Sequence, residues 1–452
     1  MNRWIQTFFW IGARRLHFWS FWFTRAWTPM GKRIVAGALA GAIFGINTEL
    51  SMVYQVFSLL LALMLFAVIA APFSRVRLAG ARQLPAQVIV GKPFEYELHL
   101  SNPTGIIQHD VVIFENFPDP RPDLNLFLHS RGDPVDRRRN IYDRWVGFHR
   151  FVGLTEKKLG IRVDKITIDA IPPHGEVHVR IKATATRRGT IHFSGLAIGR
   201  ADPLGLFYRF SPISIPGTVL AVPQSYPLPQ TFHISGGRRH LPGGMAMAAG
   251  VGEMDECVAL RDYRPGDSPR SFYWPALAKT GKWVVVERQE EFFVRHGLVL
   301  DTLHQVPEAV FEDAVSLAAS LAVRPGHPDG LLDLLFVGLQ TVQLTIGRGL
   351  GGYPRILEAL ATAQMQGEQP FSRLSQRVLS QVQRFSGLFI ILIHWDQDRE
   401  NWVRALVTQG VPLHIFLIQG EDSPPPSVPI PKGRFPGFFL LRSGAIRQGL
   451  MG

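Results

Sequence analysis

Charged and aromatic side chains gather in one short segment, residues 260–274, which reads LRDYRPGDSPRSFYW. Arg261, Arg264, Asp267 and Arg270 recur there at three-residue steps around a Pro-Gly turn. Guanidinium groups form strong, often bidentate hydrogen bonds with carboxylates, and Pro and Gly favour tight turns. We therefore predict a compact loop that is held together by ion pairs.

The rest of the sequence offers no recognisable catalytic set. It contains no nucleophile elbow, P-loop, zinc-ligand pair or kinase motif. The Gly-rich stretch at 347–352, GRGLGG, lacks the Lys-Ser/Thr pair that holds a triphosphate, and the single cysteine, Cys257, has no catalytic context. We predict a non-enzymatic protein. A hydrolase or transferase that uses the carboxylates near Asp267 and Asp301 is the alternative, and convergence of these groups in a closed pocket would favour it.

The chain has 452 residues and a formal net charge of +12. Such an excess of Lys and Arg is typical of proteins that bind nucleic acid and of proteins that lie against an anionic membrane leaflet. No helix-turn-helix, zinc-finger or aromatic RNA-binding pattern is present, and much of the basic excess flanks apolar segments. We predict contact with a lipid bilayer and no nucleic-acid partner.

Two apolar runs, at 34–46 and 52–71, predict a pair of transmembrane helices within residues 29–74. The connection between them is so short that the helices must form an antiparallel hairpin. Basic residues precede the first run and follow the second, and the connection carries none, so the positive-inside rule places the N-terminus and the soluble domains in the cytoplasm at the plasma (inner) membrane. A signal peptide is the competing interpretation of the first run. Ahead of it, residues 1–28 mix Trp and Phe with Arg, as interfacial segments do.

Alternating apolar and polar residues follow between 75 and 225, as in 94–100 and 176–181. Period-two alternation bounded by turn residues indicates a half-buried antiparallel sheet, so this part predicts a β-sandwich of the Ig or fibronectin type. The basic stretch at about 118–165 has no clear pattern and is interpreted as an inserted loop.

From 296 to 452 continuous apolar runs alternate with helical spacing, which predicts an α/β domain with a mostly parallel sheet. Residues 226–295 form a linker that contains the Arg-rich loop. The predicted fold is therefore multi-domain: a transmembrane helical hairpin, a β-sandwich and an α/β domain.

The Arg-rich loop carries the pattern Arg-x-Tyr-x-x-Gly-Asp-x-x-Arg-x-(Ile/Phe)-x-Trp, followed by Ala-x-x-Gly and a Glu that closes the next strand. Arg187-Arg188-Gly189 and the turn at 202–206 precede it near the end of the predicted sandwich. In these motifs and in the order of its parts, the chain resembles the bacterial membrane proteins catalogued as domain of unknown function number 58. The matching residues are Arg261, Tyr263, Gly266, Asp267, Arg270, Phe272, Trp274, Ala278, Gly281 and Glu287.

The resemblance implies that the α/β domain is similar to a von Willebrand factor A domain. The metal site of such domains uses Asp-x-Ser-x-Ser together with a later Thr and a later Asp. This chain reads DTLHQ at 301–305, so it keeps Asp301 and lacks both serines, while Asp396 fits the later Asp and 347–352 offers no hydroxyl. Because Mg²⁺ requires near-octahedral oxygen ligands, we expect a degenerate site at Asp301 and Asp396 and no cofactor, with bound Mg²⁺ as the alternative.

The resemblance also implies a partner, an AAA+ ATPase of the MoxR type. We therefore predict a membrane-anchored adaptor or assembly factor whose Arg-rich loop contacts that ATPase. A purely structural role for the loop, as a strap on the α/β domain, is the alternative, and a structural cell-envelope protein is a further hypothesis. The predicted contact residues are Arg261, Tyr263, Gly266, Asp267, Arg270, Trp274 and Glu287.

Overall fold

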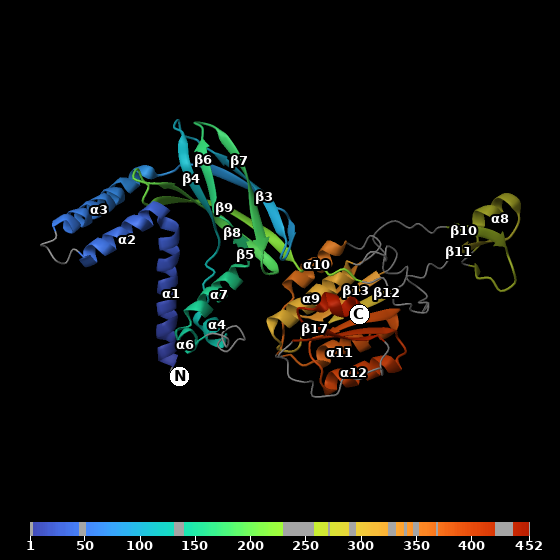
Figure 1. Cartoon of the computed structure of the whole chain (residues 1–452). Helices are drawn as coiled ribbons and strands as arrows, with labels where there is room; N and C mark the ends of the chain where they lie inside the picture. Colours follow the sequence, from blue (N-terminus) through green and yellow to red (C-terminus); the bar gives the residue numbers. More distant parts are fainter. Residues whose placement is uncertain are drawn as a thin grey trace. The chain divides into compact units, whose positions relative to one another are not determined.

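A computed structural model gives the architecture of the chain, which is mixed α/β (Figure 1). The chain divides into two compact units, Met1–Gln224 and Ser225–Gly452, and each is described by itself. The described residues are 3–44, 51–130, 140–228, 257–269, 272–288, 295–323, 331–338, 341–346, 352–367, 369–420 and 437–451.

The first unit begins with three helices, α1 (Arg3–Ala26), α2 (Pro29–Phe44) and α3 (Ser51–Ala70), and a short 3₁₀ turn, η1 (Ala71–Ser74). Within the described residues, one helix is long and apolar enough to cross a membrane, at Met52–Ala70. The helix α2 has only 16 residues, which corresponds to about 24 Å at 1.5 Å per residue, less than a hydrocarbon core of about 30 Å. The predicted transmembrane hairpin, and with it the predicted fold class, is therefore wrong: the described part of the chain contains one candidate span.

The junction between α1 and α2 is fixed to a turn that closes β8, at residues 202–206. The Thr28 amide donates to the Leu206 carbonyl oxygen at 3.1 Å, and the Thr28 hydroxyl donates to that of Gly205 at 2.5 Å. A Cβ on Gly31 would lie 2.2 Å from the Leu206 oxygen, so only glycine allows this approach. The helices thus have a defined attachment to the sheets that follow.

Two antiparallel sheets form a β-sandwich around one core. Alternate residues of the strands point inward, as Leu98, Leu100 and Ile181 do. One sheet has the order β1-β3-β7-β5 and the other the order β2-β9-β8-β4-β6, in which only the short pair of β2 and β9 is parallel. The strands are β1 (Ala79–Gln83), β2 (Gln87–Ile89), β3 (Pro93–Ser101), β4 (Gln108–Asn116), β5 (Ile161–Val163), β6 (Ile166–Ile171), β7 (Glu176–Ala185), β8 (Gly189–Ala201) and β9 (Tyr208–Val222).

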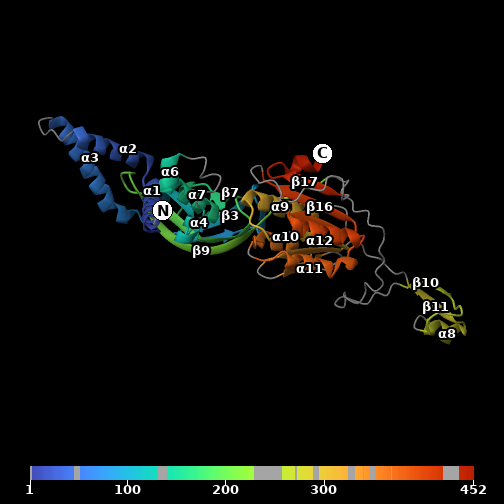
Figure 2. The same cartoon turned by 90° about the horizontal axis from the view of Figure 1, so that it is seen from below.

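The segment that we interpreted as an inserted loop contains the helices α4 (Leu124–His129), α6 (Ile141–Val146) and α7 (Phe148–Leu159). The helices α4 and α7 pack against α1 beside the sandwich, and α6 packs against α7 (Figure 2). Phe127, Phe151 and Ala13 form the small apolar cluster that joins α4, α7 and α1. The insert therefore holds α1 along one side of the first unit.

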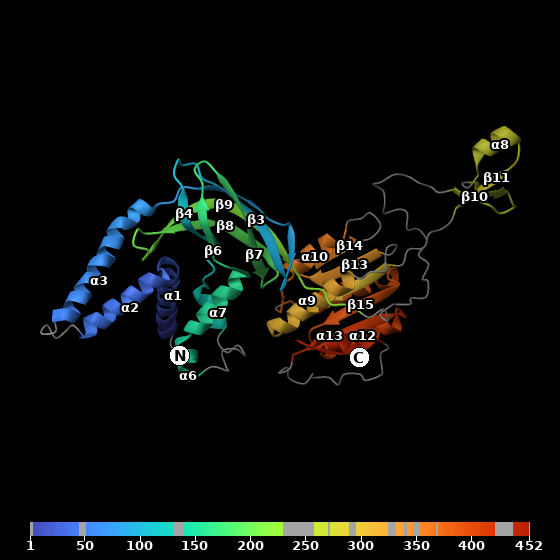
Figure 3. The same cartoon turned by 45° about the horizontal axis from the view of Figure 1, so that its top comes forward.

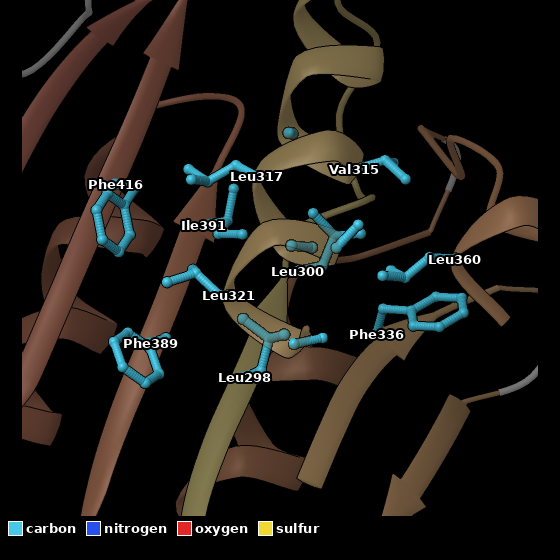
Figure 4. Packing of buried hydrophobic residues seen from close by; sticks show 14 of the residues in the cluster. Leu298, Leu300, Val315, Leu317, Leu321, Phe336, Leu360, Phe389, Ile391 and Phe416 are labelled. Atoms are coloured by element: carbon cyan, nitrogen blue, oxygen red, sulfur yellow. The ribbon is translucent and has the colours of Figure 1, made fainter. Parts of the chain in front are cut away.

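The second unit contains a six-stranded sheet in the order β14-β13-β12-β15-β16-β17, parallel except for the edge strand β14. Its continuous apolar strands are buried on both faces, as parallel sheets require. The helices α9, α10 and α13 cover one face, and α11 and α12 cover the other (Figure 1). Leu300, Leu317, Phe336 and Phe416 show the packing of the first face (Figure 4). The elements are β12 (Arg295–Leu300), α9 (Glu308–Ala322), β13 (Leu331–Val337), β14 (Thr341–Ile346), α10 (Tyr353–Thr362), α11 (Ser372–Leu379), η4 (Val382–Arg384), β15 (Gly387–Leu392), α12 (Gln397–Thr408), β16 (Leu413–Gln419), β17 (Phe438–Arg442) and α13 (Ile446–Met451).

Candidate functional site

The Arg-rich loop belongs to a small ribbon of two antiparallel strands and one helix, which we call the signature segment (Figure 3). Its elements are β10 (Cys257–Asp262), α8 (Trp274–Thr280) and β11 (Val284–Arg288). The pairing continues past β10, because the Tyr263 amide donates to the Trp283 carbonyl oxygen at 3.0 Å. The ribbon therefore fixes both ends of the loop between β10 and α8.

An ion pair braces the loop. Arg261 donates to both oxygens of Asp267, at 2.8 Å and 2.7 Å, and the Arg264 amide donates to the same carboxylate at 2.9 Å. Gly266, between them, has a φ of +110°, a conformation that favours glycine. The hydrogen bonds from Arg261 and Arg264 lower the pKa of Asp267 to about 2, so the carboxylate is ionised and is a poor general base.

Four aromatic rings form a cluster beside this brace. Phe272 lies 5.4 Å from Tyr263, 5.6 Å from Trp274 and 5.2 Å from Trp283, measured between ring centroids. Trp274 is 58% exposed and Trp283 is 49% exposed. Of the remaining predicted contact residues, Glu287 lies in β11 opposite Ala259, and Arg270 lies outside the described residues.

The second group of predicted site residues meets at the carboxyl edge of the parallel sheet. Asp301 follows β12, and Asp396 follows β15 and caps α12 by accepting from the Arg399 amide at 2.9 Å. The chain leaves β12 for β13 on one side and returns to β15 on the other, so these carboxylates lie at a topological switch point. Ligands of open α/β sheets bind at such places.

A guanidinium group lies between the two carboxylates. Arg399 donates from Nε to Asp301 Oδ2 at 2.7 Å and from Nη1 to Asp396 Oδ2 at 2.5 Å. Its third nitrogen, Nη2, donates to the Leu303 carbonyl oxygen at 3.3 Å, and Cζ of Arg399 lies 4.5 Å from the centroid of the Phe371 ring. Burial lowers the pKa of Arg399, but the two carboxylates more than offset this effect and hold the pKa above its usual value.

Two histidines stack next to this triad. The rings of His304 and His394 are 3.7 Å apart and nearly parallel. Burial is the main cause that lowers the pKa of each, and the neighbouring charge of Arg399 lowers both further. Two neutral imidazoles therefore border the triad.

The residues of this edge do not fit Mg²⁺, which the sequence analysis gave as the alternative to a degenerate site. Asp301 and Asp396 come together, as a degenerate metal site requires, but both carboxylates already bind Arg399. Thr302 donates to the last carbonyl oxygen of β13, at 2.5 Å, and is fully buried. A divalent ion would have to displace the guanidinium, and we derive no metal chemistry from this site.

No protein-family model and no curated protein matches the chain. Among solved structures, the chain is similar to the ASH/PapD-like domain of human CEP192 (PapD-like domain 7), at 14% sequence identity. The match covers 32% of this chain and 86% of that domain, with a TM-score of 0.18. A score this low carries no functional argument.

Sequence reasoning missed Arg399 and Trp283, which complete the two sites. Arg399 follows Asp396 by three residues at the start of a helix, a spacing that allows the cap and the ion pair together. The contact between Arg399 and Asp396 could therefore have been predicted from their spacing. The contact of Arg399 with Asp301 could not, because the two residues are 98 positions apart in the chain.

Proposed function

We propose that the chain is a membrane-anchored, non-enzymatic adaptor that acts with an AAA+ ATPase of the MoxR type. The ATPase would bind the signature segment, and the α/β domain, which we propose to be von Willebrand factor A-like, would present a further recognition face. The class of partner is taken from the resemblance of residues 261–287 to the family described above.

The exposed aromatic cluster carries this proposal. Solvent-exposed Trp and Tyr side chains that touch one another are costly in water and are typical of binding hot spots. In the signature segment, Trp274, Trp283 and Tyr263 are all partly exposed, and the Arg261 brace holds the loop between them. A partner that covers these rings gains apolar area without having to order the loop first.

The state of the carboxylates supports a non-enzymatic role. Asp267 is held by Arg261, and Asp301 is fully buried against Arg399. A general base must be free to accept a proton near the operating pH, and neither carboxylate meets that condition. The geometry of these groups gives the hydrolase alternative no support.

Exposed apolar surface in the first unit supports anchoring. The helix α3 is long and apolar enough to cross a membrane, and large side chains such as Leu59 and Ile69 are exposed along it. The helix α1 exposes Trp4, Phe8 and Trp19 next to arginines, as interfacial helices do. We propose that α3 anchors the chain in a bilayer and that α1 lies along the bilayer surface.

The test is an affinity capture of the full chain from detergent-solubilised native membranes. A Trp274→Ser, Trp283→Ser variant removes the aromatic contact and leaves the Arg261–Asp267 brace in place. Tyr353→Ser, a partly exposed aromatic residue on α10, is the matched control. We expect an AAA+ ATPase with the intact chain and with the control, and a strong loss with the double variant.

Two results would contradict the proposal. If no ATPase is captured with the intact chain, the adaptor function is wrong. If the double variant folds, as judged by its near-UV circular dichroism and elution volume, and captures as much ATPase as the intact chain, the contact lies elsewhere.

A further inference from the structure

The first unit contains a cavity of about 560 Å³ between α1, the end of β4, α7 and β5. Its volume is within the range of ~300–1,000 Å³ that small-molecule sites occupy. Phe18 and Phe21 from α1 and Phe114 and Phe117 from the β4 side give it aromatic walls. Phe18 and Phe21 are also about half exposed, so the cavity wall continues into the outer aromatic face of α1.

Arg25 is a cation in this cavity whose contacts, within the described part of the chain, are with aromatic rings. The Arg25 guanidinium lies 4.0 Å from the centroid of the Phe21 ring and 4.6 Å from that of the Phe114 ring. Among the residues that the structure describes, no carboxylate forms an ion pair with it, and burial alone lowers its pKa to about 10. Aromatic faces stabilise a guanidinium weakly, and its N–H groups at the ring edges stay available for an oxyanion.

The other charges of the cavity are occupied or exposed. Of the four carboxylates that border it, Glu115 and Asp119 each accept a hydrogen bond from an arginine. The remaining two, Glu156 and Asp164, are exposed to solvent. Arg25, which is partly buried, is therefore the cation that a ligand would meet beside the aromatic walls.

The position of Arg25 in the chain favours a lipid-like ligand. Two residues after it, the Trp27 ring contacts Phe207 at 4.2 Å, and Thr28 then fixes the start of α2 to the sandwich. The helix α2 packs against α3, the candidate membrane span. The cavity therefore belongs to the same unit as the candidate span, which favours a ligand that partitions into a bilayer.

We propose that this cavity binds an amphiphile with an oxyanion head, in which a phosphate or carboxylate group contacts Arg25 and the apolar part lies between the aromatic walls. Phospholipids and fatty acids share this chemistry. The proposal does not depend on the partner ATPase, and its test uses a different readout.

The experiment is native mass spectrometry of the full chain, released from a non-ionic detergent after addition of phosphatidylglycerol, decyl phosphate, inorganic phosphate or decyltrimethylammonium. We expect a retained adduct with phosphatidylglycerol and with decyl phosphate. Arg25→Gln should weaken binding roughly tenfold to a hundredfold, because a hydrogen bond to a charged group contributes about 1.5–3 kcal/mol. Retention of decyl phosphate alone would point to a soluble amphiphile, and retention of both to a site that also accepts membrane lipid.

Arg14→Gln is the matched control. Arg14 is on the same helix, is exposed and stacks on Trp10, so its loss removes an equal charge from a residue that does not line the cavity. Equal weakening by both variants would show general attraction to a basic helix and would overturn the proposal. Binding of inorganic phosphate as tightly as decyl phosphate, or of decyltrimethylammonium, would overturn it as well.

A second measurement does not rely on the folding of Arg25→Gln. A photoactivatable fatty acid is crosslinked to the intact chain, and the labelled peptides are identified. We expect labels in the peptides that contain Phe18–Phe21 and Phe114–Phe117, with competition by excess decyl phosphate. Labels confined to α3 would contradict a specific site.

Discussion

Two arginine–aspartate contacts with similar geometry lie in very different surroundings. Arg261 and Asp267 are joined by two hydrogen bonds at the surface of the signature segment, where the Arg261 side chain is 34% exposed. Arg399 binds Asp301 and Asp396 at the edge of the parallel sheet, where its side chain is 2% exposed. The number of charge-assisted hydrogen bonds is similar, so the difference is one of solvation.

The degree of solvation determines how much each contact contributes to the stability of the folded chain. At the surface, water competes for both partners and salt screens them, so the pair mainly sets the shape of a loop. In the interior, removal of one partner leaves an uncompensated charge that water cannot reach. The comparison indicates that the surface pair shapes a loop that water reaches, whereas the protein's own cation, Arg399, occupies the switch point of the sheet.

The largest expected effect comes from breaking the buried contact. Arg399→Met removes the cation that Asp301 and Asp396 share, leaves the buried Asp301 charge uncompensated, and should destabilise the second unit by about 3–5 kcal/mol. Hydrogen exchange of β12 and β15 amides in the full chain measures this loss. Arg373→Ala, which removes an exposed arginine of α11, is the control and should leave these amides unchanged. Unchanged exchange in Arg399→Met would show that the triad does not stabilise the sheet.

An intermediate effect is expected from the histidine pair beside the triad. The pKa values of His304 and His394 are lower in the folded chain than the usual 6.5, so below about pH 6.5 the unfolded chain binds more protons. The stability of the second unit should therefore be fully present above this pH and should fall as the pH drops below it.

The measurement is the protection of β12 amides between neutral and acidic pH, corrected for the intrinsic pH dependence of exchange. His304→Asn, His394→Asn should flatten the dependence, and the exposed control His109→Asn should not. A slope that survives the double substitution would assign the pH dependence to other groups.

The smallest expected effect on stability comes from the surface contact. Asp267→Asn should speed exchange at the Tyr263 and Arg264 amides and leave β12 and β15 unchanged. Because the pKa of Asp267 is lowered to about 2, the brace should persist as the pH falls to about 4 and should be lost as the pH falls through about 2. Destabilisation of the sheet by Asp267→Asn would contradict the separation of the two contacts.

Local patterns explain which features could be predicted. The alternation at 94–100 lies within β3, and the apolar runs before Asp301 and Asp396 lie in β12 and β15, because side-chain periodicity depends only on neighbouring residues. The bracing of the Arg-rich loop was also predictable, since Arg261 and Asp267 are six residues apart. The prediction of a transmembrane hairpin was wrong because it was based on apolar composition and did not take the length of the helix into account. The helix α2 has 16 residues, fewer than a membrane span requires.

The sequence by itself determined the apolar span at Met52–Ala70, the positions of many strands and the ion-paired loop, because each depends on residues close together in the chain. Only the tertiary structure decided which groups complete the sites. Arg399 reaches Asp301 across 98 positions, and Arg25 meets Phe114 only because α1 packs beside the sandwich. These contacts form between distant segments whose residues carry no sign of their partners, so the closed switch point and the open cavity became visible only in the folded chain.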